Sequence, residues 1–233
     1  MPYTRSVARH TALQRMAALR TSFVYAKVRT RQLPTAIRDS IFQNCVFQLS
    51  ATLEDYLYQV TSSWFARLFS GNSANSAIPL MTRALYVARS QEEAFRRFLG
   101  LRDESDLATR TYGKINIFDA LNDNGQVLIS DYDSILLRDR KFPSVDNVSV
   151  MFRRIGMQKI FQSLNRRTST NVELSLRGFM DIRNALAHEN PPSITDLDVA
   201  NYFDQLDLII SAVDREFYKH VTRCSGQQNW PNM

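Results

Sequence analysis

The stretch AIRDSIFQNCVFQLSATLEDYLYQVTSSWFARLF, residues 36–69, decides the fold class of this chain. From Ile37 to Leu68 its apolar residues recur every three or four positions, and they do not alternate with polar ones as in a strand. This spacing gathers them along one side of a helix, where they can face a core. Residues 70–73, Ser-Gly-Asn-Ser, supply the turn that ends it. The sequence therefore predicts one long core helix.

The C-terminal part of the chain repeats this pattern in two more helices. Asn171 can cap the first, and Pro191-Pro192 ends it because proline has no N–H for a helical hydrogen bond. Thr195 can cap the second, which runs to about His220. Their apolar stripes are Val172, Leu176, Phe179, Ile182 and Leu186 in the first, and Val199, Phe203, Leu206, Ile210, Val213 and Phe217 in the second.

Two shorter helices are expected just before this pair. Ser144 can cap a helix that runs to Ile155, and Gly156 is suited to end it. The next short helix covers residues 158–165. These segments and the three longer ones predict an all-α protein, a helical bundle with four to five core helices.

The middle of the chain is less regular. Residues 78–89 and 91–98 have the spacing of two short helices, and the charged residues 99–112 predict a loop. Residues 115–136 contain Asn-Asp-Asn-Gly before an apolar run, which leaves a local hairpin open. We therefore expect an irregular insertion over about residues 100–141.

The N-terminal segment is strongly basic. No Asp or Glu precedes Asp39, although the whole chain has a net charge of only +6. The cations are Arg5, Arg9, Arg15, Arg20, Lys27, Arg29, Arg31 and Arg38. Such a segment suits RNA, because cations that neutralise phosphates release condensed counterions, but a solvated helix face can carry the same charges. Residues 1–33 are predicted as a basic helix, 34–220 as the helical domain and 221–233 as a flexible tail.

Composition narrows the function classes. No apolar run approaches the roughly 20 residues that span a bilayer, so we expect no membrane partner and a cytoplasmic protein. Cys45 and Cys224 lie far apart and are expected to be reduced thiols. The three histidines do not cluster, which predicts no protein-bound metal and no cofactor.

Residues 183–188, Arg-Asn-Ala-Leu-Ala-His, are the candidate for chemistry. Arg183 can hold a phosphate with its planar guanidinium, and His188 can transfer a proton near neutral pH. On a regular helix the two are offset by about 140°, whereas Asn184 and His188 share a face. A surface arginine and a helix-end histidine that favours the helix dipole would have the same sequence.

The setting of this run resembles the HEPN domain superfamily, and more closely the larger HEPN-like nucleases related to the RiboL-PSP group. There an arginine, often followed by a polar residue, precedes a histidine by four to six positions near a helix end. Arg183, Asn184 and His188 match those positions, and residues 143–157 resemble the preceding segment. Residues 53–57, Leu-Glu-Asp-Tyr-Leu, resemble an early family helix with an acidic residue facing the site.

The resemblance implies a homodimer with metal-independent endoribonuclease activity, often that of a toxin or an anti-phage effector. It implies Arg183 and His188 as catalytic residues. Asn184, Asp181 and Glu54 are supporting candidates: Asn184 can bind phosphate, and Asp181 can orient the imidazole. RNA-binding candidates are Arg5, Arg9, Arg15, Arg20, Lys27 and Arg29. His10 and His220 are expected to face solvent.

One position departs from part of the family. Toxins silenced by nucleotidyl transfer carry a tyrosine two residues after the histidine, where this chain has Asn190. An antitoxin or defence-system partner protein remains open. The rival interpretations are a non-catalytic module that binds RNA, nucleotide or protein, and a helical dimerisation protein whose basic segment faces solvent.

Overall fold

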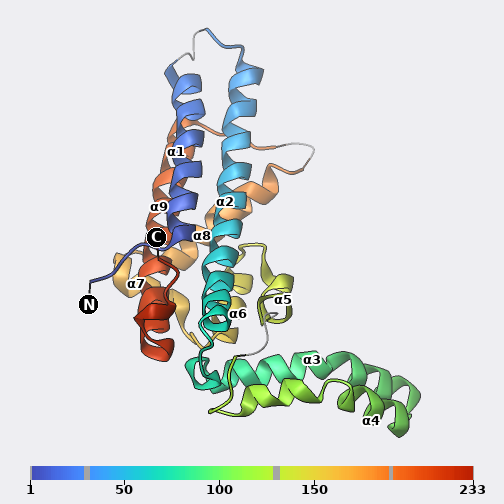
Figure 1. The fold of residues 1–233 in the computed structure, drawn as a ribbon. Coiled ribbons are helices and arrows are strands. Elements are labelled where there is room, and N and C mark those ends of the chain that lie inside the picture. Colours follow the sequence, from blue (N-terminus) through green and yellow to red (C-terminus); the bar gives the residue numbers. More distant parts are fainter. Residues whose placement is uncertain (1, 29–31, 128–131, 189–190, 233) are drawn as a thin grey trace.

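Three long helices lie side by side and form the body of the protein (Figure 1). They are α1 (Val7–Val28), α2 (Thr35–Ser70) and α9 (Asp196–Ser225). The computed structural model describes residues 2–28, 32–127, 132–188 and 191–232, and within these ranges the chain is helical and forms no strand. The all-α prediction is confirmed.

The predicted stripe of α2 forms the centre of the core. Cys45, Leu49, Leu53, Val60, Trp64 and Leu68 are fully buried. Burying one such aliphatic side chain contributes about 1.5–3 kcal/mol. Ile37, in the first turn of α2, is 50% exposed, so the stripe becomes core only further along the helix.

The basic helix α1 is part of the bundle. Its buried apolar side chains, Ala8, Ala12, Met16, Phe23 and Ala26, face α2 and α9. The Phe23 ring lies 5.7 Å from the rings of both Phe42 on α2 and Phe203 on α9, measured between centroids. The small alanines let the helix backbones approach closely, and Arg15, Arg20 and Lys27 lie on the exposed faces.

Both ends of the chain are fixed on α9. The Asp214 carboxylate is fully buried and accepts hydrogen bonds from the Tyr3 and Tyr56 hydroxyls. Trp230 is 1% exposed, and its indole N–H donates to the Thr4 carbonyl at 3.0 Å. The predicted flexible tail is therefore wrong up to Asn232, because the Trp230 ring anchors it and α9 itself continues to Ser225.

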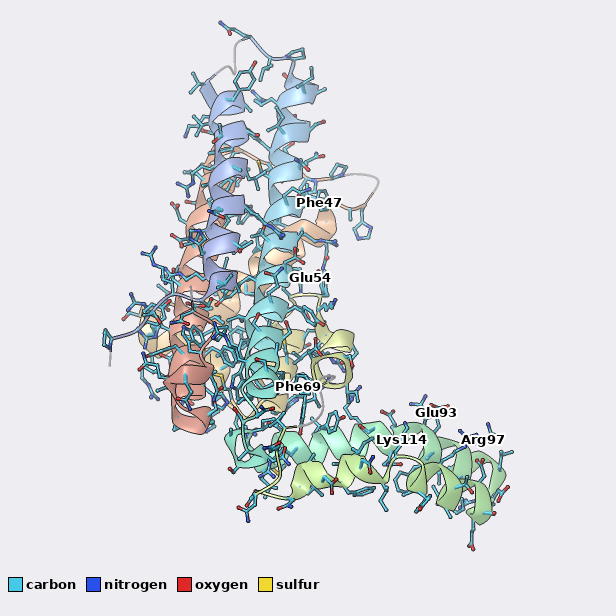
Figure 2. The ribbon with its side chains drawn as sticks, in the orientation of Figure 1. Phe47, Glu54, Phe69, Glu93, Arg97 and Lys114 are labelled. Atoms are coloured by element: carbon cyan, nitrogen blue, oxygen red, sulfur yellow. The ribbon has the colours of Figure 1, made fainter. Side chains whose placement is uncertain are left out.

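Helices α3 (Leu80–Leu101) and α4 (Glu104–Tyr112) project sideways from one end of the bundle (Figures 1 and 2). The prediction of two short helices before residue 99 is wrong, since α3 is continuous and the Ser90 hydroxyl inside it donates to the Tyr86 carbonyl. The predicted loop over 99–112 is also wrong. The Asp103 carboxylate caps α4 by accepting from the Ser105 and Asp106 amides, a start that the apolar spacing did not reveal.

No local hairpin forms in the described part of residues 115–136, where Gln126 instead makes an isolated antiparallel bridge with Ala74. The segment instead contains the 3₁₀ helix η2 (Ile115–Leu121) and helix α5 (Tyr132–Leu136), and residues 128–131 lie outside the described ranges. The insertion over about residues 100–141 stays a prediction, and α4 makes that stretch more helical than expected.

Three smaller helices complete the bundle: α6 (Val145–Arg154), α7 (Ile160–Thr168) and α8 (Val172–Ala185). The predicted caps are confirmed, since Ser144 accepts from the Asn147 amide, Asn171 from the Leu174 amide and Thr195 from the Asp198 amide. Gly156 follows α6 with φ +93°, a conformation that residues with a Cβ rarely adopt.

Candidate functional site

Helix α8 ends inside the Arg183–His188 run. Its buried face is Val172, Leu176, Phe179 and Met180, and its last residue is Ala185. The chain then turns, with the Ala187 amide donating to the Asn184 carbonyl and the His188 amide to the Ala185 carbonyl. Arg183 and Asn184 therefore lie in the last helical turn, whereas His188 lies beyond it. The offset of a regular helix does not apply to this pair.

Two aromatic rings hold the Arg183 guanidinium. Its Cζ lies 5.6 Å from the centre of the Phe47 ring and 5.3 Å from that of Phe142. The faces of aromatic rings are negative, so they attract this cation and restrict its plane. Arg183 Nη1 donates to Asn184 Oδ1 at 3.3 Å, and the buried Nε has no acceptor among the described residues. The site thus presents a positioned cation whose guanidinium donates a single hydrogen bond among the described residues.

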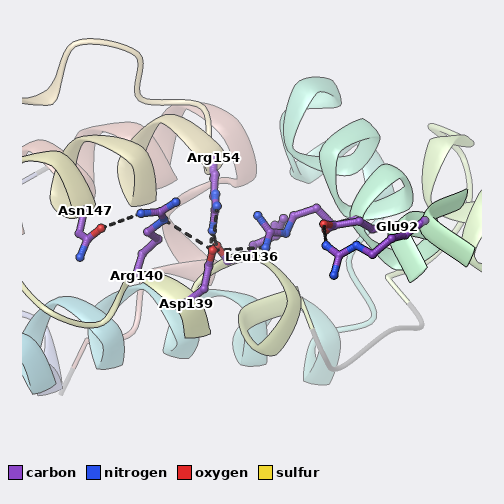
Figure 3. A network of polar contacts seen from close by, with 8 residues as sticks. Glu92, Leu136, Asp139, Arg140, Asn147 and Arg154 are labelled. Carbon is purple, nitrogen blue, oxygen red and sulfur yellow. Dashed lines mark hydrogen bonds and ion pairs between the residues drawn. The ribbon is translucent and has the colours of Figure 1, made fainter. Parts of the chain in front are cut away.

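The segment that delivers Phe142 is itself fixed by a polar network (Figure 3). The buried Arg154 guanidinium binds the Asp139 carboxylate, which also pairs with Arg89 of α3 at 3.3 Å. The hydrogen bond from Arg154 lowers the pKa of Asp139, so this carboxyl stays ionised. Arg140 donates to Asn147 Oδ1 at 2.9 Å. These contacts set residues 139–142 against α6.

His188 and its supporting candidates lie in exposed positions. The side chains of His188, Asn184 and Asp181 are exposed, and neither Asp181 nor Glu54 forms a hydrogen bond to His188 in the part of the chain that is described. The orienting role predicted for Asp181 therefore has no contact behind it. Asn190 lies outside the described residues.

Glu54 is half-buried on α2, seven residues after Phe47. Seven residues make two helical turns, so the two side chains share one face of α2, as Figure 2 shows. Within the described ranges Glu54 pairs with no lysine or arginine, so a surface salt bridge does not account for this carboxylate. It lies about 10 Å along the helix from the ring that contacts Arg183.

The basic residues of α1 are mostly engaged within the bundle. Arg15 pairs with Asp55, Arg20 with Asp204 at 2.8 Å, and Lys27 with Asp196 at 3.1 Å. Arg5 is exposed, and Arg29 lies outside the described residues. All three paired side chains are about half exposed, so their contact with RNA stays a prediction.

Arg9 is a correction to that set. It is 7% exposed, and its guanidinium donates to the Tyr3 hydroxyl at 2.8 Å and to the Ser211 hydroxyl at 2.6 Å. A side chain committed to these contacts is not available to phosphate. Apolar spacing could not reveal this, because the burial comes from the N-terminal segment folding over α9.

His220 is also a correction. It is 3% exposed, not solvent-facing, because it continues the buried stripe of α9 beyond Phe217. Its Nε2 lies 2.8 Å from the Ile155 carbonyl oxygen, to which it donates. Burial lowers the pKa of His220 to about 4, so the ring is neutral near pH 7. His10 is half-buried.

Sequence reasoning missed Phe47 and Phe142 as site residues. Phe47 lies between Cys45 and Leu49, off the core stripe of α2, and a large aromatic on that face was a usable signal. Phe142 carried no comparable signal, because its contact depends on how residues 139–142 pack. Among the described residues no group of three or more His, Cys, Asp or Glu could hold a metal ion, and no described helix has the length and apolar character to cross a membrane.

Comparison with known proteins identifies the family. The family model of RiboL-PSP-HEPN proteins matches residues 23–219, which is most of the chain. The chain therefore belongs to the RiboL-PSP-HEPN family of HEPN domains, whose functions are related to RNA and often include ribonuclease activity. Comparisons with curated proteins and with solved structures give no match.

Proposed function

We propose that this protein is a metal-independent endoribonuclease in which Arg183 binds the scissile phosphate and His188 transfers protons. The observation that carries the proposal is the Arg183 guanidinium held between Phe47 and Phe142, five residues before an exposed histidine. A cation fixed before RNA binds loses little freedom on meeting the phosphate, which favours its use in stabilising developing charge.

The proposed reaction is attack of a ribose 2′-oxygen on the adjacent phosphorus. The new O2′–P bond forms as the P–O5′ bond breaks, which leaves a 2′,3′-cyclic phosphate and a free 5′-hydroxyl. One His188 takes the proton of the 2′-hydroxyl, and an acid must supply a proton to the leaving 5′-oxygen. Arg183 neutralises the charge that develops on the two non-bridging oxygens.

A homodimer supplies that acid. His188 of a second copy, in its protonated form, can protonate the leaving oxygen while the first His188 acts as base. A single histidine cannot do both in one step. Mixed dimers test this division of roles: the proposal expects dimers with one His188→Ala chain to lose most activity, and full activity in such dimers contradicts it.

The biological role that we propose is that of a toxin or anti-phage effector held in check by a partner protein. The test is expression of the wild type beside Arg183→Ala and His188→Ala, with growth and RNA integrity followed in the same cultures. We expect growth arrest and RNA fragments only with the wild type. Equal toxicity of all three proteins contradicts the catalytic assignment, and RNA binding without cleavage by purified wild type favours the alternative, a non-catalytic binding module.

A further inference from the structure

A second site candidate lies at the far end of α9. The turn between α6 and α7 forms one wall of a cavity of about 410 Å³, and residues 216–223 of α9 form the other. This volume is within the range of small-molecule sites. From Asp196, where the chain returns after His188, to Lys219 is about 35 Å along the helix. The cavity is therefore separate from the proposed ribonuclease site.

Cations dominate the lining of this cavity. Lys159 projects from the α6–α7 turn, and Lys219 and Arg223 from successive turns of α9. Glu216 is the one carboxylate in the lining, and Arg167 and Lys219 already neutralise it, with N–O distances of 2.5 and 3.2 Å. No described carboxylate pairs with Lys159 or Arg223. The cavity thus keeps an excess of positive charge, unlike α1, where Arg15, Arg20 and Lys27 face acidic partners.

The two walls are fixed to each other. Gly156 packs so tightly that a Cβ would lie 2.9 Å from Pro79 Cγ and 3.3 Å from His220 Cε1. The bond from His220 to the Ile155 carbonyl joins α9 to the end of α6. Because His220 Nε2 carries the proton, its Nδ1 is free to accept, and Arg223 Nη2 lies 3.5 Å from it. The cations therefore project from walls that are already in position.

We propose that this cavity binds a small oligophosphate, a compact molecule with two or three linked phosphate groups, through Lys159, Lys219 and Arg223. Three cations on two facing walls match a short run of negative charge better than a single anion. The cavity also includes the start of α7, whose first amides no side chain caps, and these add to the preference for a phosphate. The proposal does not depend on the ribonuclease activity.

Calorimetric titration of the full chain with sodium tripolyphosphate at constant ionic strength tests the proposal. We expect saturable binding of one tripolyphosphate per chain. Lys159→Gln and Arg223→Gln should each weaken binding about tenfold or more, since each removes one charge-assisted contact. Glu216→Gln should tighten binding, because it removes the one carboxylate among the described lining residues and releases Lys219, which lines the cavity. Arg153→Gln is the matched control: it removes an exposed cation of α6 that does not line the cavity, and it should change affinity less than twofold.

Four results would overturn the proposal. One is the absence of saturable binding by the wild type. Another is that Arg153→Gln weakens binding as much as Lys159→Gln does, which would mean diffuse charge attraction. Equal affinity for citrate would remove the preference for phosphate. Displacement of tripolyphosphate by a short RNA at equal phosphate concentration, lost in Arg223→Gln, would assign the cavity to RNA instead.

Discussion

The two ends of the α8–α9 pair carry histidines in opposite environments. His188 is exposed, just beyond the last turn of α8 and five residues after an arginine held by two aromatic rings. His220 is buried on α9, with its ring centre 5.8 Å from that of Trp64. Its Nε2–H donates a hydrogen bond to the Ile155 carbonyl. The comparison teaches that a histidine on a core stripe joins helices, whereas one placed past a helix end remains available for chemistry.

The largest effect on RNA cleavage should come from a substitution of the exposed His188. His188→Ala removes the proposed proton carrier, and general acid–base catalysis contributes about 10²- to 10⁴-fold to rate. RNA cleavage by the purified variant should fall by that factor with its melting temperature unchanged. His10→Ala is the matched control and should keep wild-type activity. Unchanged cleavage by His188→Ala would break the contrast between the two histidines.

The buried end should instead control stability against pH. The pKa of His220 is about 4 in the folded protein and about 6.5 in the unfolded chain. Between these values the unfolded chain binds the extra proton, so the stabilisation is complete above about pH 6.5 and is lost as the pH falls towards 4. The loss amounts to about 3 kcal/mol.

Urea unfolding at pH 7 and pH 4.5 measures this loss. His220→Gln keeps an N–H donor but cannot titrate, so its free energy of unfolding should fall less between the two pH values. The same dependence in His188→Ala as in the wild type is the expected control result. A variant at position 220 that is as sensitive to acid as the wild type would mean that other groups cause the loss.

A smaller effect should follow from loosening the arginine. Phe142→Leu removes one ring from the Arg183 guanidinium, and such a contact contributes about 0.5–2 kcal/mol. Cleavage efficiency should fall about 2- to 30-fold, with Phe47→Leu behaving alike. Phe95→Leu, at a 52% exposed phenylalanine of the projecting helix α3, is the control. If all three variants cleave equally well, the rings do not position Arg183.

The smallest effect is expected on α1. Arg15→Gln breaks an ion pair with Asp55 whose two side chains are about half exposed, so stability should change by less than about 1 kcal/mol. If Arg15 also contacts RNA, the negative slope of log affinity against log salt concentration should become shallower by about 1 in Arg15→Gln. An unchanged slope would mean that Arg15 forms the ion pair with Asp55 and does not contact RNA.

The sequence predicted those features that local chemistry determines. The period of α2 and the caps Ser144, Asn171 and Thr195 depend on residues close in the chain, and all four predictions are confirmed. The prediction of a flexible tail failed because Trp230 is anchored by Thr4, more than two hundred residues away in the sequence. The prediction of a loop in place of α4 failed because this helix is stabilised by the Asp103 cap and by packing on α3, and it buries no apolar side chain fully.

The candidate site divides in the same way. The Arg183–His188 run and its place near a helix end were visible in the sequence, and the family match supports the resemblance. The rings around Arg183 come from α2 and from the segment before α6, which meet it only in the folded chain. The predictions that Arg9 is available to RNA and that His220 faces solvent were wrong. The burial of both side chains depends on packing against segments that are distant in the sequence.

The most direct test of the central claim is cleavage of an end-labelled RNA by the purified protein in excess EDTA. We predict cleavage by the wild type, fragments that end in a 2′,3′-cyclic phosphate and begin with a 5′-hydroxyl, and no cleavage by Arg183→Ala or His188→Ala. Loss of wild-type cleavage in EDTA would contradict the metal-independent mechanism, and cleavage retained in either variant would contradict the assignment of Arg183 and His188.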